Sequence, residues 1–244
     1  MKKPEDLNKE ENARLVIDFI HRIAIHYGIW FSEVIKHLGR EKAYTVLENA
    51  WKNSYSIQMS RLAKTIGFEM IGDIPTPLLS LTDDQLNKLR ESLAVNWLAN
   101  DGVWFQAVEF TEGMTAAKIC NDNSWSYFSP FEALSIKRML NLAEKPGLDG
   151  LKQALQFRLY ALINKHSITE ETPDSFIYLM NDCRVQSARK RKNLEDYPCK
   201  SAGIIEYTEF AQAIDARIKT KCICCPPDKH PKEYYCAWKF EIEN

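Results

Sequence analysis

The chain has 244 residues, of which 45% are hydrophobic and 27% charged; these are ordinary globular values and argue against disorder. A net charge of -1 argues against a general nucleic-acid binder, although a local basic patch is compatible with it. No apolar run approaches the length of a membrane span, and the charged N-terminus does not resemble a secretory signal. We therefore expect a cytoplasmic protein that uses no membrane. The sequence does not indicate its oligomeric state.

Apolar residues at helical spacing predict a mostly helical first part, residues 1–170. The first predicted helix covers residues 12–27 and ends at Gly28. A capping-box pattern over residues 82–85 predicts the start of a later helix. The run Ser129-Pro130-Phe131-Glu132 predicts another start, because serine, proline and glutamate suit the N-cap, N1 and N3 positions.

A sequence repeat divides this helical part. Gly28-Ile29-Trp30-Phe31 reappears 74 residues later as Gly102-Val103-Trp104-Phe105. The same offset relates further identical residues without a gap, namely Val34 and Val108, Gly39 and Gly113, Ala43 and Ala117, Asn49 and Asn123, and Trp51 and Trp125. We interpret this as a duplicated helical unit over residues 28–66 and 102–140. Its tryptophans are expected in the core, with an aromatic ligand pocket between the copies as the alternative.

The second part, residues 171–244, changes to a period of two, which is typical of strands around a helix predicted over 199–215. The residues predicted to share one side of each strand are Ile177, Leu179, Cys183 and Val185, then Ile218, Thr220 and Cys222, then Tyr234, Cys236, Trp238, Phe240 and Ile242. We predict an α+β fold, rich in helix, whose C-terminal antiparallel sheet ends in a cysteine-rich hairpin. Both parts are expected to pack as one compact body.

Six of the seven cysteines lie between residues 183 and 236. The hairpin brings Cys222, Cys225 and Cys236 together, and Cys222 and Cys225 have the C-x2-C spacing of zinc ligands. We therefore predict a zinc site, with Cys199 or Cys183 as its fourth ligand. The alternatives are that these cysteines pack as small hydrophobes, or that Cys199 is a reactive thiol at a helix N-terminus.

Cations on separate elements predict an anion-binding surface formed by Arg184, Arg189, Lys200, Arg217 and Lys219, because guanidinium groups suit carboxylates. A solvated face is the alternative for the basic run at 189–192. Nucleic acid is not expected as the partner, since aromatic residues do not alternate with these cations. Glu206 beside an apolar stripe is a candidate general base or metal ligand, with a structural ion pair as the alternative.

Several short motifs also resemble known families. The segments Tyr197-Pro198-Cys199-Lys200, Cys225-Pro226-Pro227-Asp228 and Cys236-Ala237-Trp238 resemble an uncharacterised family of cytosolic proteins, itself similar to the L-2-amino-thiazoline-4-carboxylic acid hydrolase-like proteins. The closing order of helix, strand, cysteine, hairpin and cysteine resembles the 4-vinyl-reductase ligand-binding domain, whose last cysteines can hold zinc. On that resemblance, the last two cysteines of that domain correspond to Cys222 and Cys236 of this chain. The resemblance implies an α+β fold with a small-molecule pocket.

Three functions remain open from the sequence. The first is a pocket protein that binds or acts on a small carboxylate-bearing molecule beside a cysteine-metal site. The second is a hydrolase that uses Cys199 or Glu206. The third is a ligand sensor or interaction module without turnover. A cavity lined by Glu206 or Cys199 in a strongly perturbed state would favour the enzyme.

Overall fold

The structure is a computed structural model that describes residues 3–191, 193 and 196–242. The chain divides into two compact units, Met1–Ser80 (unit 1) and Leu81–Asn244 (unit 2). The boundary of these units lies between the two sequence repeats, and within unit 2 the second repeat shares its core with the C-terminal sheet. None of the described helices is long and apolar enough to cross a membrane.

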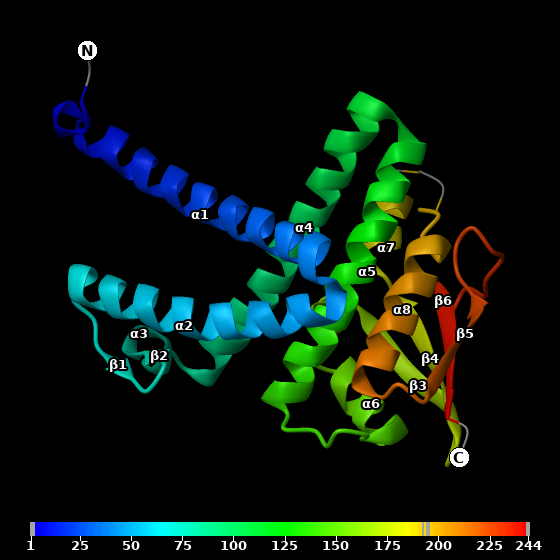
Figure 1. Ribbon diagram of the computed structural model, residues 1–244. Helices are drawn as coiled ribbons and strands as arrows, with labels where there is room; N and C mark the ends of the chain where they lie inside the picture. Colours follow the sequence, from blue (N-terminus) through cyan, green and yellow to red (C-terminus); the bar gives the residue numbers. More distant parts are fainter. Residues whose placement is uncertain (1–2, 192, 194–195, 243–244) are drawn as a thin grey trace. The chain divides into compact units, whose positions relative to one another are not determined.

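Unit 1 is a pair of long helices followed by small elements (Figure 1). Its elements are η1 (Pro4–Asp6), α1 (Lys9–Leu38), α2 (Arg40–Ile66), β1 (Met70–Ile71), β2 (Ile74–Pro75) and α3 (Thr76–Leu79). Helix α1 continues through Gly28, so the helix end predicted there is wrong. A glycine within a helix costs only about 1 kcal/mol, which the surrounding turns of a 30-residue helix can offset.

Unit 2 begins with a second helix pair, α4 (Asp83–Glu112) and α5 (Met114–Met139), built like the first. Helix α4 starts and ends 74 residues after α1, and the N-caps Asn8 and Thr82 both form capping boxes. The glycines that join the helices, Gly39 and Gly113, have φ of 81° and 88° with ψ of 163° and 168°. Only glycine adopts this region easily, so the repeated glycine sets the same turn in both copies.

The rest of unit 2 is a sheet covered on one face by helices. Its elements are α6 (Gly147–Leu155), η2 (Leu159–Leu162), β3 (Lys165–Thr172), β4 (Ser175–Asp182), α7 (Arg184–Arg191), α8 (Lys200–Ile214), β5 (Ile218–Cys224) and β6 (Cys236–Ile242). The strands form one antiparallel sheet in the order β3-β4-β6-β5. The predicted α+β fold is confirmed, and so is the final hairpin of β5 and β6.

Helix α8 lies on the sheet (Figure 1), and α5 packs against α8 to complete the core. The inner face of β6 carries Trp238 and Phe240, as its alternation predicts. In β4 the buried side belongs to Tyr178 and its even-numbered neighbours, and the side shared by Ile177 and Leu179 is only half-buried. Tyr178 pairs with Trp238, and this register places the even-numbered residues of β4 on the face that the helices cover.

The structure also corrects two local predictions. Strand β4 ends at Asp182, so Cys183 and Val185 are not strand residues. Helix α5 runs through Pro130, so residues 129–132 do not start a helix. Their polar groups serve tertiary contacts: Ser129 donates a hydrogen bond to the backbone carbonyl of Glu206, and Glu132 pairs with Arg158.

We expect Gly203→Ala to destabilise unit 2. Gly203 of α8 faces the indole of Trp238, and an added Cβ would lie 2.8 Å from Cζ2 of that ring, which is buried and cannot withdraw. Overpacking of this kind costs about 1–3 kcal/mol. The measurement is urea-induced unfolding followed by tryptophan fluorescence.

Gly102→Ala is the matched control, because a Cβ at this helical glycine meets no atom within 4 Å. It should leave the free energy of unfolding unchanged or raise it by up to about 1 kcal/mol. Equal destabilisation by both substitutions would contradict the close packing assigned to Gly203.

Candidate ligand-binding pocket

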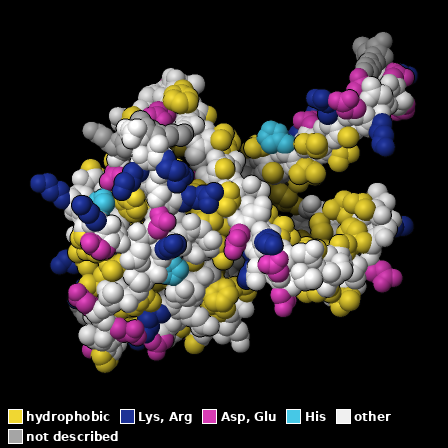
Figure 2. Space-filling model, turned by 180° about the vertical axis from the view of Figure 1, so that it is seen from behind, with side chains coloured by type: hydrophobic (Ala, Val, Ile, Leu, Met, Phe, Trp, Pro, Cys, Tyr) yellow, Lys and Arg dark blue, Asp and Glu magenta, His cyan; other side chains and the backbone are white. Residues whose placement is uncertain are grey.

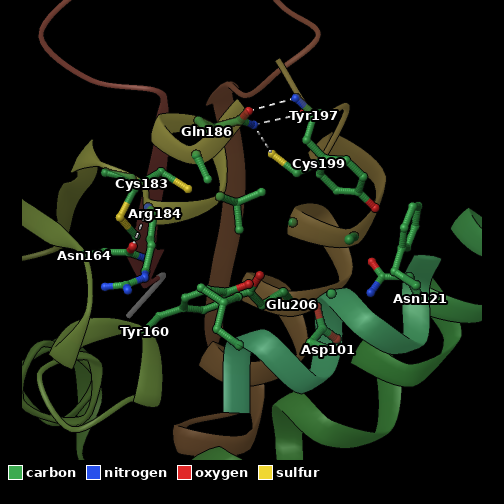
Figure 3. Close-up of a pocket in the computed structure, with 18 of the residues that line it drawn as sticks. Asp101, Asn121, Tyr160, Asn164, Cys183, Arg184, Gln186, Tyr197, Cys199 and Glu206 are labelled. Carbon is green, nitrogen blue, oxygen red and sulfur yellow. Dashed lines mark hydrogen bonds between the residues drawn. The ribbon is translucent and has the colours of Figure 1, made fainter. Parts of the chain in front are cut away.

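A cavity of about 430 Å³ lies wholly within unit 2, among α4, α5, η2, β4, α7, α8 and β6 (Figure 3). Its size is typical of a pocket for a small organic molecule. Much of the lining is aliphatic or aromatic, contributed by Val95, Leu98, Ala99, Phe105, Trp125, Tyr160, Met180, Val185, Tyr207 and Trp238. The sequence prediction of tryptophans in the core holds for Trp125, which is 5% exposed and contributes to the pocket wall. It is wrong for Trp30, Trp51 and Trp104, which are exposed.

One wall of the pocket carries polar groups without partners. Asp101 of α4 is half-buried and forms no hydrogen bond or ion pair with any described residue, and burial raises the pKa of its carboxyl. Asn121 of α5 lies near it (Figure 3). The buried hydroxyl of Tyr197 has no hydrogen-bond partner among the described residues. Polar atoms buried without partners are uncommon in proteins, so the Tyr197 hydroxyl is available to a ligand, as is the half-buried carboxyl of Asp101.

The floor of the pocket is held by a buried ion network. Arg158 precedes η2 and is 2% exposed. Its Nε donates to Oε2 of Glu132 on α5 at 2.9 Å, and its Nη2 lies 2.7 Å from Oε1 of Glu206 on α8. The contact between Arg158 Nη2 and Glu206 Oε1 is an ion pair but not a well-directed hydrogen bond, because neither atom has a hydrogen-bond partner among the described residues. Glu206 itself lines the pocket beside Asp101 and Tyr160 (Figure 3).

The environment of this network determines its protonation. Burial raises the pKa of Glu206 to about 7, and the nearby Arg158 only partly opposes this effect. Burial also disfavours the charge on Arg158, but Glu132 and Glu206 outweigh it and raise the pKa of the guanidinium. The guanidinium further lies 4.6 Å from the ring centre of Phe210, a cation–π contact. Glu206 therefore exchanges its proton near neutral pH while Arg158 keeps its charge.

Three of the predicted cysteines meet at the pocket. The Sγ atoms of Cys199 and Cys225 are 3.5 Å apart, and Cys236 accepts a hydrogen bond from the indole of Trp238 at 3.3 Å. The hydrogen bond from Cys225 lowers the pKa of the Cys199 thiol against the opposing effect of burial. The hydrogen bonds that Cys225 forms with Cys199 and Cys236 raise the pKa of the Cys225 thiol. Cys222 does not line the pocket.

The arrangement does not fit a metal ion. Within residues 3–191, 193 and 196–242, no group of three or more histidine, cysteine or acidic side chains could hold one. The predicted set of Cys199, Cys222, Cys225 and Cys236 thus forms a thiol cluster only in part. Burial raises the pKa of Cys183, the alternative fourth ligand, to about 12.

The predicted basic residues divide between two places. Arg184 and Arg189 line the pocket. Lys200, Arg217 and Lys219 do not: Lys200 pairs with Asp228, and Arg217 pairs with Asp215. The geometry therefore does not assemble the predicted five-residue anion surface. The last residue of the basic run, Lys192, lies outside the described residues.

Sequence reasoning missed two residues that the pocket depends on, Arg158 and Asp101. A signal for Arg158 was present, since an arginine beside the apolar stripe of Leu151 and Leu155 needs buried carboxylates if its helix packs inward. Asp101 precedes the repeated Gly102 motif in the place that Tyr27 holds in the first copy. The repeats differ there, and that difference marks a position specific to unit 2.

Comparison with known proteins places the chain in a family. The sequence model of a family described as "Family of unknown function (DUF6125)" matches residues 5–82 and again residues 79–242. Because these matches span most of the chain, the chain belongs to this family, and the predicted membership of an uncharacterised family is confirmed.

The other comparisons are weak. The phenol-responsive sensory domain of the transcription activator PoxR, solved with phenol, has a TM-score of 0.39 and 15% identity, over 78% of this chain and 89% of that one. A similarity at this level carries no argument about the ligand. No curated protein matches the chain significantly. The expected similarities to thiazoline-carboxylate hydrolases and the 4-vinyl-reductase domain are not shown by these comparisons.

We expect Arg158→Met to destabilise unit 2 by about 3–5 kcal/mol, because it leaves Glu132 and Glu206 buried without their cation. The triple variant Arg158→Met, Glu132→Gln, Glu206→Gln should recover part of this loss, since it removes the buried charges together. Urea-induced unfolding provides both values. A triple variant less stable than Arg158→Met would contradict the charge explanation.

The pKa of Glu206 predicts a pH-dependent stability. Between the ordinary glutamate pKa and about 7, the folded state keeps a proton that the unfolded state releases, so the free energy of unfolding falls as pH rises. This loss amounts to about 1.4 kcal/mol for each pKa unit between the two values. Glu206→Gln removes the group that exchanges this proton. The free energy of unfolding of the variant, relative to wild type, should therefore rise from about pH 5 to about pH 8. A difference between the two proteins that does not change with pH would refute the assignment.

Proposed function

We propose that unit 2 binds a small, largely apolar molecule carrying a hydrogen-bond donor, and that the protein is a ligand sensor or interaction module without turnover. The observation that carries this proposal is the polar end of the pocket. There the unpartnered carboxylate of Asp101 lies beside the buried carboxylate of Glu206. An apolar lining with a few converging polar groups is the usual form of a specific ligand pocket.

The chemistry of this polar end favours a donor on the ligand. Two carboxylates face the cavity, and Asn121 and Tyr197 add oxygen atoms that can accept hydrogen bonds. An ammonium or hydroxyl group placed there would satisfy Asp101, whereas a carboxylate would meet charges of its own sign. The titratable groups that could catalyse a reaction already have structural partners, since Glu206 contacts Arg158 and the Cys199 thiol contacts Cys225 and Gln186.

A carboxylate-bearing ligand is the second candidate. Arg184 favours it, because this residue lines the opposite side of the pocket from Asp101 (Figure 3) and a guanidinium suits a carboxylate. In that pose the apolar body of the ligand would lie against the aromatic wall and its anion would point toward α7. The two candidates therefore differ in the charge of the ligand and in the residue that recognises it.

A hydrolase is the third candidate, supported by the lowered pKa of the Cys199 thiol and the pKa of Glu206 near 7. A zinc ion held by the predicted cysteines is not supported by the described geometry. Metal analysis of protein purified without added zinc tests that prediction directly. Recovery of each ligand unchanged after long incubation, measured by mass spectrometry, tests for turnover.

Three molecules with the same ring separate the ligand classes: benzylamine, benzyl alcohol and benzoate. We expect benzylamine and benzyl alcohol to bind more tightly than benzoate, by at least about tenfold, because one unfavourable charge contact costs more than 1 kcal/mol in a partly buried site. Calorimetric titration gives the affinities. Quenching of tryptophan fluorescence provides a second readout, because Trp125 and Trp238 line the pocket.

Variants identify the recognising residue. Asp101→Asn should weaken benzylamine binding by about tenfold, and Glu112→Gln, an exposed carboxylate on the same helix outside the pocket, should not change it. Preference for benzoate, lost in Arg184→Met, would establish the carboxylate candidate instead. Failure of all three molecules to bind at millimolar concentration would contradict a pocket for small aromatic ligands.

A further inference from the structure

Unit 1 exposes an unusual amount of apolar surface. Fifteen large apolar side chains of α1 and α2 are exposed, while only Ala43 and Ala63 of these helices are buried. The two helices diverge from Gly39, and Figure 2 shows hydrophobic side chains along the sides of the two arms that face each other. A soluble protein rarely leaves an apolar patch of this size uncovered.

The second copy of the repeat shows how such a pair of helices is filled. In unit 2 the ring of Tyr160, on η2, lies between the two helices, with ring centres 4.9 Å from Trp97 of α4 and 5.7 Å from Trp125 of α5. The equivalent residues of unit 1 are Ile23 and Trp51. Trp51 is 59% exposed, against 5% for Trp125. No described residue within unit 1 takes the place of Tyr160.

The spacing of the exposed residues of α1 indicates what could cover them. Val16, Ile20, Ile23, Tyr27 and Trp30 follow one another at intervals of four and three residues. This heptad spacing keeps one stripe of a helix against neighbouring helices in a coiled coil or four-helix bundle. The required partner is therefore helical, and it must offer an apolar stripe of similar length.

We infer that the α1–α2 pair binds the α1–α2 pair of a second copy of this chain, so that the two pairs form a four-helix bundle. Each α1–α2 pair has an open space between its two helices. Its own apolar helices could in turn fill the corresponding space in a second copy. Such a surface is self-complementary, as a two-fold interface requires. Residues 1–80 contain 11 basic and 10 acidic residues, so net charge does not oppose self-association.

The available area is sufficient for a stable dimer. Half-exposed aromatic and aliphatic side chains present roughly 100 Å² each, so covering eight to ten of the fifteen would hide roughly 800–1,000 Å² per chain. A standard protein interface buries about 800 Å² on each partner. The helix pair then obtains through association the core that it lacks alone.

The test is the oligomeric state of the full chain, measured by light scattering with size-exclusion chromatography and by sedimentation equilibrium between about 1 and 100 μM. We expect a dimer. The double substitution Ile20→Glu, Ile23→Glu places charges in the centre of the stripe and should weaken the dimer at least about 100-fold. Ile17→Glu is the matched control. Ile17 is exposed on the same helix, but it points about 100° around the helix axis from Val16 and therefore lies off the stripe. This substitution should leave the dimer intact.

Circular dichroism checks that each variant keeps its helices. If the double variant loses them, Trp30→Lys repeats the test at another exposed position of the stripe. A wild-type monomer over the whole concentration range would overturn the inference, whatever other partner covers this surface. A dimer that survives the stripe substitutions, or one that Ile17→Glu disrupts equally, would overturn it as well.

Discussion

The buried guanidinium of Arg158 determines how unit 2 is assembled. Its two carboxylate partners come from α5 and α8, and the same Glu132 also accepts a hydrogen bond from the backbone of Leu159 at 2.9 Å. A buried charge is tolerated only when its partners are in place, so these elements have one mutual arrangement that leaves no charge alone. Hydrophobic packing between α5 and α8 supplies the energy of this arrangement, and the ion network makes it specific.

The pocket follows from the same constraint. Because η2 is fixed beside α5, Tyr160 enters the space between α4 and α5, and Glu206 is held at the edge of the cavity without being withdrawn into the core. The cavity thus has an aromatic side and an acidic end whose charge depends on pH. The thiols of Cys199 and Cys225 close the wall near the sheet, where Gln186 holds the backbone of Tyr197 through two hydrogen bonds of 2.8 Å.

Local patterns predicted local structure well, and long-range partners poorly. The alternation of β6, the capping box at Thr82 and the repeat at Gly102 depend on neighbours in sequence, so the strand, the helix start and the duplicated pair could be read from them. The face of β4 depends on its register with β6, and the role of Glu132 depends on Arg158, 26 residues away. The sequence marks Glu206 as a candidate general base or metal ligand, but its partner Arg158 comes from a separate element that only the fold brings close.

The two helix pairs differ in whether they carry a buried charge at one equivalent position. The place that Glu132 holds in α5 is held in α2 by Gln58, whose amide contacts Tyr27 and Ser54. Arg158 lies beyond the second copy, which covers residues 102–140, so the first copy contains no counterpart of it. A neutral amide needs no buried cation, so one scaffold can exist in an uncharged form and a charged form. A carboxylate at this turn therefore requires a counter-ion from outside the helix pair, and in unit 2 Arg158 provides it.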